Sequence, residues 1–268
     1  MIEVDDEAIT RSAVKVWRRV MAMSSDTLEL VTVTTRYERI TTPSGEEFEA
    51  YCAVPAGTPR PGVLLFQEIF GINDNMRALA ERLAEEGYVT MVPDMFWRIE
   101  PRFERKDESG IGDAFAMVQK FNFGTAVADI QSTHAHLLSI SECSGTVGAV
   151  GFCLGGGLAF AAATMSRVNG RGPDATVCYY GSPVNDLLGS VESLECPIMF
   201  HYGREDAFIP PEKIAEVEQT VCERENVSFY LYDAGHAFSN WDAPSMYNQE
   251  AADLAWSRTI DFFNSHLR

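Results

Sequence analysis

Alternating apolar and polar stretches predict two strands near the start of the chain and a buried strand soon after them. Residues 28–37 are rich in Val and Thr, and residues 48–54 form a second strand-like run after the turn at 43–45. Residues 63–66 are continuously apolar, which is typical of a strand buried on both faces of a sheet.

Strands and helices then alternate to the end of the chain. Further strands are expected at 88–92, 147–152, 176–180, 198–202 and 228–232. Helices are expected after a cap at Asn73 or Asp74, at 126–140, from 154, at 211–224 and at 245–266. Repeated strand–helix units predict an α/β fold with a mostly parallel central sheet and helices on both faces. Residues 96–125 break this rhythm, and we expect them to form an excursion over the sheet.

The N-terminal part of the chain has a different pattern. Within residues 7–23, apolar side chains recur at helical spacing while Arg and Lys side chains lie off that stripe, which predicts an amphipathic helix. We therefore divide the chain into an N-terminal helical extension at 1–28 and one α/β domain at 29–268.

Composition narrows the class of protein. The 268 residues are 46% apolar and 22% charged, which are globular proportions and exclude extensive disorder. With 39 acidic and 21 basic residues the formal net charge is −18, which argues against nucleic acids and anionic membranes as partners. No stretch has the pattern of a secretory signal or of a membrane span. The six cysteines form no C-x-x-C pair, which argues against a structural zinc site, and we expect free thiols in a reducing cytoplasm.

The sharpest motif lies at residues 151–157, which read Gly-Phe-Cys-Leu-Gly-Gly-Gly. The motif follows a predicted strand and opens a predicted helix, as a nucleophile elbow does. Cys153 is then the nucleophile, and the amide of Leu154 faces the place where an oxyanion forms. The alternatives are a small buried Cys153 in a glycine-rich turn, or a dinucleotide loop, whose G-x-G-x-x-G pattern the glycines do not fit.

Two further residues follow the motif in the order of an α/β-hydrolase triad, in which nucleophile, acid and His succeed one another along the chain. Asp206 comes just after the predicted strand at 198–202, and His236 just after the strand at 228–232. Because the carboxyl ends of parallel strands meet at one edge of the sheet, we expect Cys153, Asp206 and His236 to meet there. Taken singly, Asp206 also fits a turn residue and His236 a surface loop residue, whereas His201 fits a residue of the apolar core.

At this point the sequence resembles a known family, the dienelactone hydrolases (carboxymethylenebutenolidases). The resemblance covers residues 30–265 and rests on segments at 67–71 (Gln-Glu-Ile-Phe-Gly), 93–94 (Pro-Asp), 151–156, 179–181 (Tyr-Tyr-Gly), 200–203 (Phe-His-Tyr-Gly) and 234–238 (Ala-Gly-His-Ala-Phe). It implies an α/β-hydrolase fold.

The resemblance also implies roles for further residues. Glu68 contacts the resting thiol, is displaced when substrate binds and helps to generate the thiolate; the amides of Ile69 and Leu154 form the oxyanion hole; and Arg98 binds a substrate carboxylate. From the residues alone, Glu68 also fits a capping or salt-bridging acid, and Arg98 a solvated surface residue. One position departs from the family, because Asn240 stands where a second arginine is expected, and this weakens carboxylate recognition.

We therefore expect a hydrolase of an ester or lactone with a small acyl part, either anionic or neutral, acting through a Cys-His-Asp triad and a thioester acyl-enzyme. This hydrolase chemistry needs neither a metal nor a cofactor. The expected partner is a small-molecule ester or lactone, and the expected state is a monomer or small homo-oligomer. Two alternatives stay open: a related α/β-hydrolase acting on a thioester or other acyl bond, and a catalytically silent α/β domain that binds a small ligand.

Overall fold

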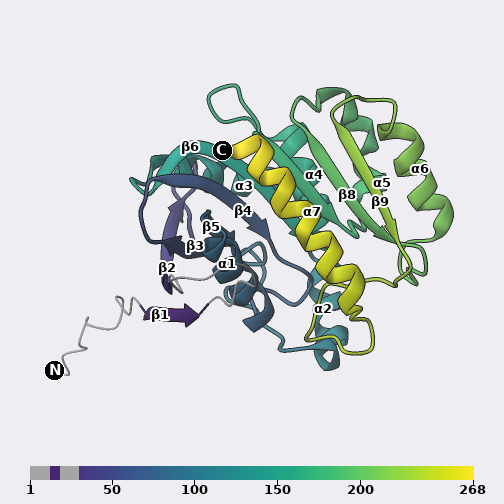
Figure 1. Cartoon of the computed structure of the whole chain (residues 1–268), viewed down its shortest axis with the longest axis horizontal. Coiled ribbons are helices and arrows are strands. Elements are labelled where there is room, and N and C mark those ends of the chain that lie inside the picture. Colours follow the sequence, from purple (N-terminus) through teal and green to yellow (C-terminus); the bar gives the residue numbers. More distant parts are fainter. Residues whose placement is uncertain (1–12, 19–29) are drawn as a thin grey trace, which may run out of the picture.

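The computed structural model describes residues 13–18 and 30–268, in which a nine-stranded sheet is flanked by helices (Figure 1). The strands are β1 (Ala13–Arg18), β2 (Leu30–Thr41), β3 (Glu47–Pro55), β4 (Arg60–Phe66), β5 (Val89–Pro93), β6 (Cys143–Phe152), β7 (Ala175–Tyr179), β8 (Ile198–Gly203) and β9 (Val227–Tyr232). Their order is β1-β2-β3-β5-β4-β6-β7-β8-β9. The pairs from β1 to β5 are antiparallel, and those from β5 through β4 to β9 are parallel, which confirms the predicted mostly parallel sheet.

Helices cover both faces of this sheet. They are α1 (Asp74–Glu85), α2 (Ile111–Val118), α3 (Phe123–Ser139), α4 (Leu154–Met165), α5 (Val184–Leu187), α6 (Pro211–Val221) and α7 (Gln249–Leu267), with short 3₁₀ turns η1 (Glu108–Gly110) and η2 (Leu188–Ser193). Leu79 of α1 and Phe263 of α7 belong to one cluster of buried residues. Ile130 of α3, Leu158 of α4 and Val217 of α6 belong to another. Because successive residues of β4 alternate between the two clusters, these cores lie on opposite faces of the sheet.

None of the described helices is long and apolar enough to cross a membrane.

The N-terminal segment differs from the prediction. Residues 13–18, which we expected inside a helix at 7–23, form the edge strand β1 antiparallel to β2. Val14 and Val16 alternate with Lys15, so this short stretch satisfies the period of a strand as well as that of a helix. The other residues of the segment lie outside the described ones, and the proposed boundary at 28/29 stays a prediction.

The excursion between β5 and α3 is tied to the loop after β4. Gly71 and Glu104 form an isolated antiparallel bridge, and Gly71 has a φ of 78°. A Cβ at Gly71 would lie 1.8 Å from the carbonyl oxygen of Phe103, so only glycine permits this approach. The contact holds the segment that contains α2 beside the carboxyl end of β4.

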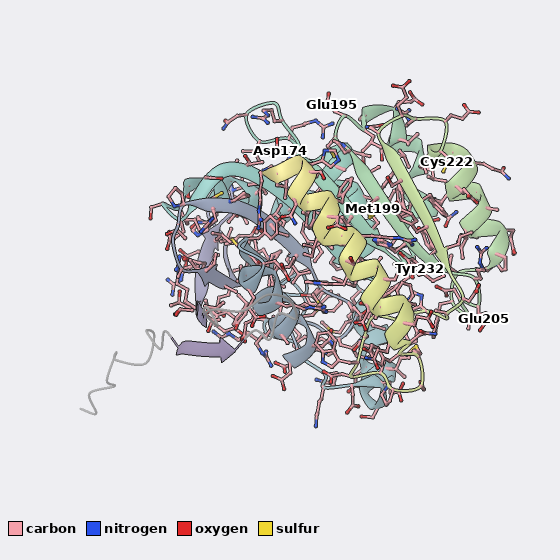
Figure 2. The ribbon with its side chains drawn as sticks, viewed as in Figure 1. Asp174, Glu195, Met199, Glu205, Cys222 and Tyr232 are labelled. Carbon is pink, nitrogen blue, oxygen red and sulfur yellow. The ribbon has the colours of Figure 1, made fainter. Side chains whose placement is uncertain are left out.

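His201 is a buried residue of β8, as the sequence predicts. Its Nδ1 lies 2.8 Å from the hydroxyl of Tyr232, which Figure 2 labels at the end of β9, and its Nε2 lies 3.2 Å from Oγ1 of Thr259. Burial lowers the pKa of His201 from 6.5 to about 3, so the ring is neutral at physiological pH.

A substitution on β6 tests how closely α7 packs against the sheet. A Cβ at Gly148 would lie 2.7 Å from Cδ1 of Leu267 and 3.1 Å from Cε1 of Phe263. Gly148→Val therefore displaces α7, and we expect the free energy of unfolding to fall by about 1–3 kcal/mol in urea denaturation. Gly189→Ala is the control, because nothing lies within 4 Å of its added Cβ. Equal stability of the two variants would contradict the packing described.

Candidate active site

Cys153 sits on a sharp turn between β6 and α4. It caps α4 with φ of 54° and ψ of −115°, a conformation that is costly for a residue other than glycine. The turn depends on glycines, because a Cβ at Gly151 would lie 1.9 Å from the carbonyl oxygen of Gly155. A Cβ at Gly155 would lie 2.2 Å from the carbonyl oxygen of Phe66 at the end of β4. The backbone therefore has the geometry of a nucleophile elbow and lifts the thiol above the sheet.

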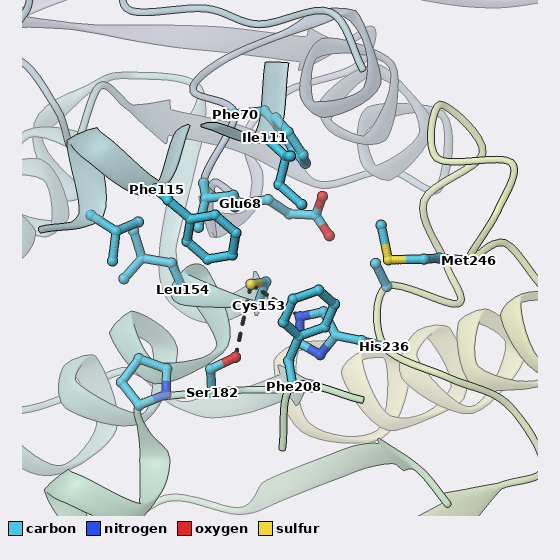
Figure 3. A pocket seen from close by; sticks show the side chains of 14 residues that line it. Glu68, Phe70, Ile111, Phe115, Cys153, Leu154, Ser182, Phe208, His236 and Met246 are labelled. Carbon is cyan, nitrogen blue, oxygen red and sulfur yellow. Dashed lines mark hydrogen bonds between the residues drawn. The ribbon is translucent and has the colours of Figure 1, made fainter. Parts of the chain in front are cut away.

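The structure brings the three predicted triad residues together. Nε2 of His236 lies 3.2 Å from Sγ of Cys153, and Nδ1 of His236 lies 2.8 Å from Oδ2 of Asp206. The thiol has a second, longer contact of 3.9 Å with Oγ of Ser182 (Figure 3). Three strand ends, those of β6, β8 and β9, thus supply an unbroken line from a carboxylate through an imidazole to a thiol.

Asp206 is held in place by the main chain. Its Oδ1 accepts hydrogen bonds of 2.8 Å from the amides of Phe208 and Ile209, which leaves Oδ2 for His236. This arrangement fixes the orientation of the imidazole ring.

The charge of His236 is determined by its two neighbours. Burial alone lowers the pKa of His236, but the neighbouring Cys153 and Asp206 outweigh it and raise that pKa from 6.5 to about 10. The site therefore favours an imidazolium facing the sulfur near neutral pH.

Glu68 lines the same cavity, and its hydrogen bonds go to residues other than Cys153. Its Oε1 accepts a hydrogen bond of 3.2 Å from the hydroxyl of Tyr180, and its Oε2 accepts one of 2.5 Å from Nδ2 of Asn240. Burial raises the pKa of Glu68, and the charge of His236 and these two hydrogen bonds oppose the rise. Glu68 is thus bonded to Tyr180 and Asn240 in this structure, and its expected contact with the resting thiol stays a prediction.

The two residues expected to form the oxyanion hole, Ile69 and Leu154, both line the cavity beside Cys153. In the described ranges, the main-chain N–H groups of Ile69 and Leu154 donate to no main-chain carbonyl. Leu154 is also the first residue of α4, where the helix dipole favours negative charge.

The cavity above the thiol has a volume of about 230 Å³ and is largely apolar. Besides Cys153 and His236, its lining contains Glu68, Ile69, Phe70, Ile111, Phe115, Val118, Leu154, Ser182, Pro183, Phe208, Ala237 and Met246. Within the described part of the chain, the cavity lining contains neither Lys nor Arg. The sequence predicted the polar residues of this site but missed the apolar residues of α2. The spacing of residues 111, 115 and 118 is typical of one face of a helix and could have indicated them.

Arg98 pairs with acidic residues of the protein. It does not line the cavity, and its guanidinium forms a two-pronged contact with Asp129, at 3.0 and 2.9 Å, and a third at 3.0 Å with Glu46. It also lies over the ring of Trp97, 4.1 Å from the centroid. Two carboxylates of the protein thus occupy the guanidinium in this structure, and the expected role of Arg98 in binding a substrate carboxylate stays a prediction.

No group of three or more potential metal ligands among His, Cys, Asp and Glu gathers within residues 13–18 and 30–268.

Comparisons with known proteins show which family the chain belongs to. A model of the dienelactone hydrolase family matches residues 48–267. The chain is 32% identical over 219 residues to a carboxymethylenebutenolidase of a Pseudomonas species, covering 81% of this chain and 90% of that relative. A carboxymethylenebutenolidase of Cupriavidus pinatubonensis is 31% identical over 224 residues, covering 83% of this chain and 93% of the relative. A solved Klebsiella pneumoniae structure, described provisionally as a dienelactone hydrolase, matches with TM-score 0.74 and 25% identity, over 87% of this chain and 99% of that one.

The position of Arg98 leads to a prediction. Arg98→Ala leaves the carboxylate of Asp129, whose side chain is 3% exposed, without its cation, so we expect the free energy of unfolding to fall by roughly 2 kcal/mol. The kcat/KM values for neutral and anionic esters should change by the same factor. Arg204→Ala removes an exposed ion pair with Asp233 and is the control for stability. A selective rise in KM for the anionic ester would restore Arg98 to substrate binding.

Proposed function

Because the chain belongs to the dienelactone hydrolase family, we propose that it hydrolyses a carboxylic ester or lactone with Cys153 as the nucleophile. The observation that carries this proposal is the line of contacts from Asp206 to His236 at 2.8 Å and from His236 to Cys153 at 3.2 Å. A carbonyl compound above the thiol would meet the nucleophile, a proton donor and two free amides at once.

The first half of the reaction makes a thioester. The Cys153 thiolate attacks the carbonyl carbon, a carbon–sulfur bond forms, and the carbonyl electron pair moves onto the oxygen. The amides of Ile69 and Leu154 bind this oxyanion, a contribution of roughly 3–4 kcal/mol per donor in well-studied enzymes. The carbon–oxygen bond to the alcohol then breaks, and Nε2 of His236 gives its proton to the leaving oxygen.

The second half of the reaction hydrolyses the thioester. His236, now neutral, takes a proton from water as the water oxygen attacks the acyl carbon. The carbon–sulfur bond breaks, the carboxylic acid leaves, and the thiolate–imidazolium pair is restored. Asp206 keeps the ring oriented and stabilises its positive charge through both halves.

Glu68 completes the proposed site. Held by Tyr180 and Asn240, it places a carboxyl near the imidazolium, and its participation in thiolate formation stays a prediction. The cytoplasmic location, the state as monomer or small homo-oligomer, and the absence of nucleic-acid and membrane partners also stay predictions from the sequence.

Replacing the nucleophile tests the proposal directly. We expect Cys153→Ala to lower kcat for p-nitrophenyl esters by at least about 1000-fold, because the variant lacks the thiol that forms the acyl-enzyme and contacts His236. Intact-mass spectrometry after brief mixing should show an acyl adduct on the wild type and none on this variant. Cys222→Ala, which changes an exposed thiol near the end of α6 (Figure 2), is the control and should retain both adduct and turnover. Undiminished turnover by Cys153→Ala would rule out Cys153 as the nucleophile.

The charge pair predicts a pH effect. The folded-state pKa of His236 is raised from 6.5 to about 10. The contribution of the protonated ring to the free energy of unfolding is therefore fully present below about pH 6.5 and is lost as pH rises through about 10. Cys153→Ala removes the largest of the groups that raise this pKa, so we expect the pKa of His236 to fall by at least about one unit. NMR titration of the His236 ring measures it, and an unchanged pKa would show that the thiolate does not hold the proton there.

A further inference from the structure

We propose that this active site selects neutral esters with an apolar acyl group, and that the face of α2 formed by Ile111, Phe115 and Val118 is the acyl-binding wall. The inference rests on the proposed function and names the substrate class of the same site. It departs from the anionic acyl group that remained open on the sequence alone.

The wall comes from one side of a short amphipathic helix. Ile111, Phe115 and Val118 follow one another at steps of four and three residues and all line the cavity, whereas Ala114 and Met117 are buried and do not line it. Met117 therefore anchors α2 in the core, while Ile111, Phe115 and Val118 contact whatever occupies the cavity.

The acyl side of the cavity follows from the chemistry. His236 must protonate the leaving oxygen, so the alcohol lies on the side of His236, and the acyl group extends to the opposite side of the thiol. Figure 3 shows Phe115 and Leu154 on the side of Cys153 away from His236 and Met246. The acyl group thus meets α2, and the alcohol meets the Met246 side.

A substrate carboxylate has no cation to bind on this acyl side. The lining contains no Lys or Arg among the described residues, Arg98 is occupied by Asp129 and Glu46, and the amide of Asn240 is occupied by Glu68. Glu68 itself adds a carboxyl to the cavity wall. An anionic acyl group would therefore lose its hydration without gaining a partner, which is strongly unfavourable.

The mouth of the cavity is also apolar. Phe115 and Phe208 are 41% and 48% exposed, and their ring centroids are 6.3 Å apart. Exposed aromatic residues paired over an apolar cavity are typical of a surface that an apolar ligand covers.

The test compares two esters that differ only at the end of the acyl chain. p-Nitrophenyl hexanoate ends in a methyl group and mono-p-nitrophenyl adipate ends in a carboxylate, while chain length and leaving group are the same. We expect the wild type to prefer the hexanoate by at least about 100-fold in kcat/KM, since an unpaired carboxylate in the cavity is costly. A preference for the adipate, or equal values, would overturn the inference.

A charge placed on the wall should shift this preference. Phe115→Arg puts a cation at the acyl side of a partly exposed position, and we expect the adipate-to-hexanoate ratio to rise at least about tenfold. Met165→Arg adds the same charge at a position of similar exposure, 43%, that does not line the cavity, and should leave the ratio unchanged. Equal ratios for Phe115→Arg and Met165→Arg would remove α2 from acyl binding.

A second variant covers the case in which arginine is not tolerated at this position. Phe115→Ala removes the ring without adding charge, so the kcat/KM ratio of hexanoate to acetate esters should fall, and an unchanged ratio would contradict the assignment of the wall. If the wild type hydrolysed neither ester of the first pair, the proposed function would fail together with this inference. If it hydrolysed both and preferred the adipate, only the inference would fail.

Discussion

The close approach of α4 to the sheet is the constraint on which the rest of this site depends. Gly155 lies against the carbonyl of Phe66, and Gly156 lies against Gly181, so that neither can carry a side chain. Because the helix begins so near the strands, the chain must turn at Cys153 through a conformation that non-glycine residues rarely adopt. That turn exposes the thiol at the same sheet edge where the loops after β8 and β9 deliver Asp206 and His236.

The protonation of His236 depends on its nearest neighbours. His236 lies between a sulfur and a carboxylate in a largely water-excluded position, so these two neighbours govern its proton more than the overall charge of −18 does. Glu68 is a second buried acid a short distance away, yet its two hydrogen-bond donors come from Tyr180 and Asn240 rather than from the triad. The two buried acids thus have different partners: Asp206 holds the ring of His236, and Glu68 forms part of the cavity wall.

The parts of this structure that the sequence predicted are those governed by chain order and periodicity. Apolar runs located the strands after residue 28, and the order of Cys153, Asp206 and His236 after successive strands predicted that these three side chains meet. The partners of Arg98 and Asn240 were not predictable, because they depend on which acids other elements bring within reach. Residues 13–18 were misassigned because a stretch of six fits two periods equally well and pairing with β2 decides between them.

Arg98 and Asn240 have one feature in common, because neither supplies a cation to the cavity. If Glu68 were bonded to the thiol, a substrate anion would be needed to move it, and a cation would be needed to hold that anion. Here the thiol already faces His236, Glu68 already has other donors, and the two positions that would supply cations supply none to the cavity. Under the proposed mechanism, the contact of the thiol with His236 therefore does not depend on a bound substrate carboxylate, and the described cavity offers no cation for one.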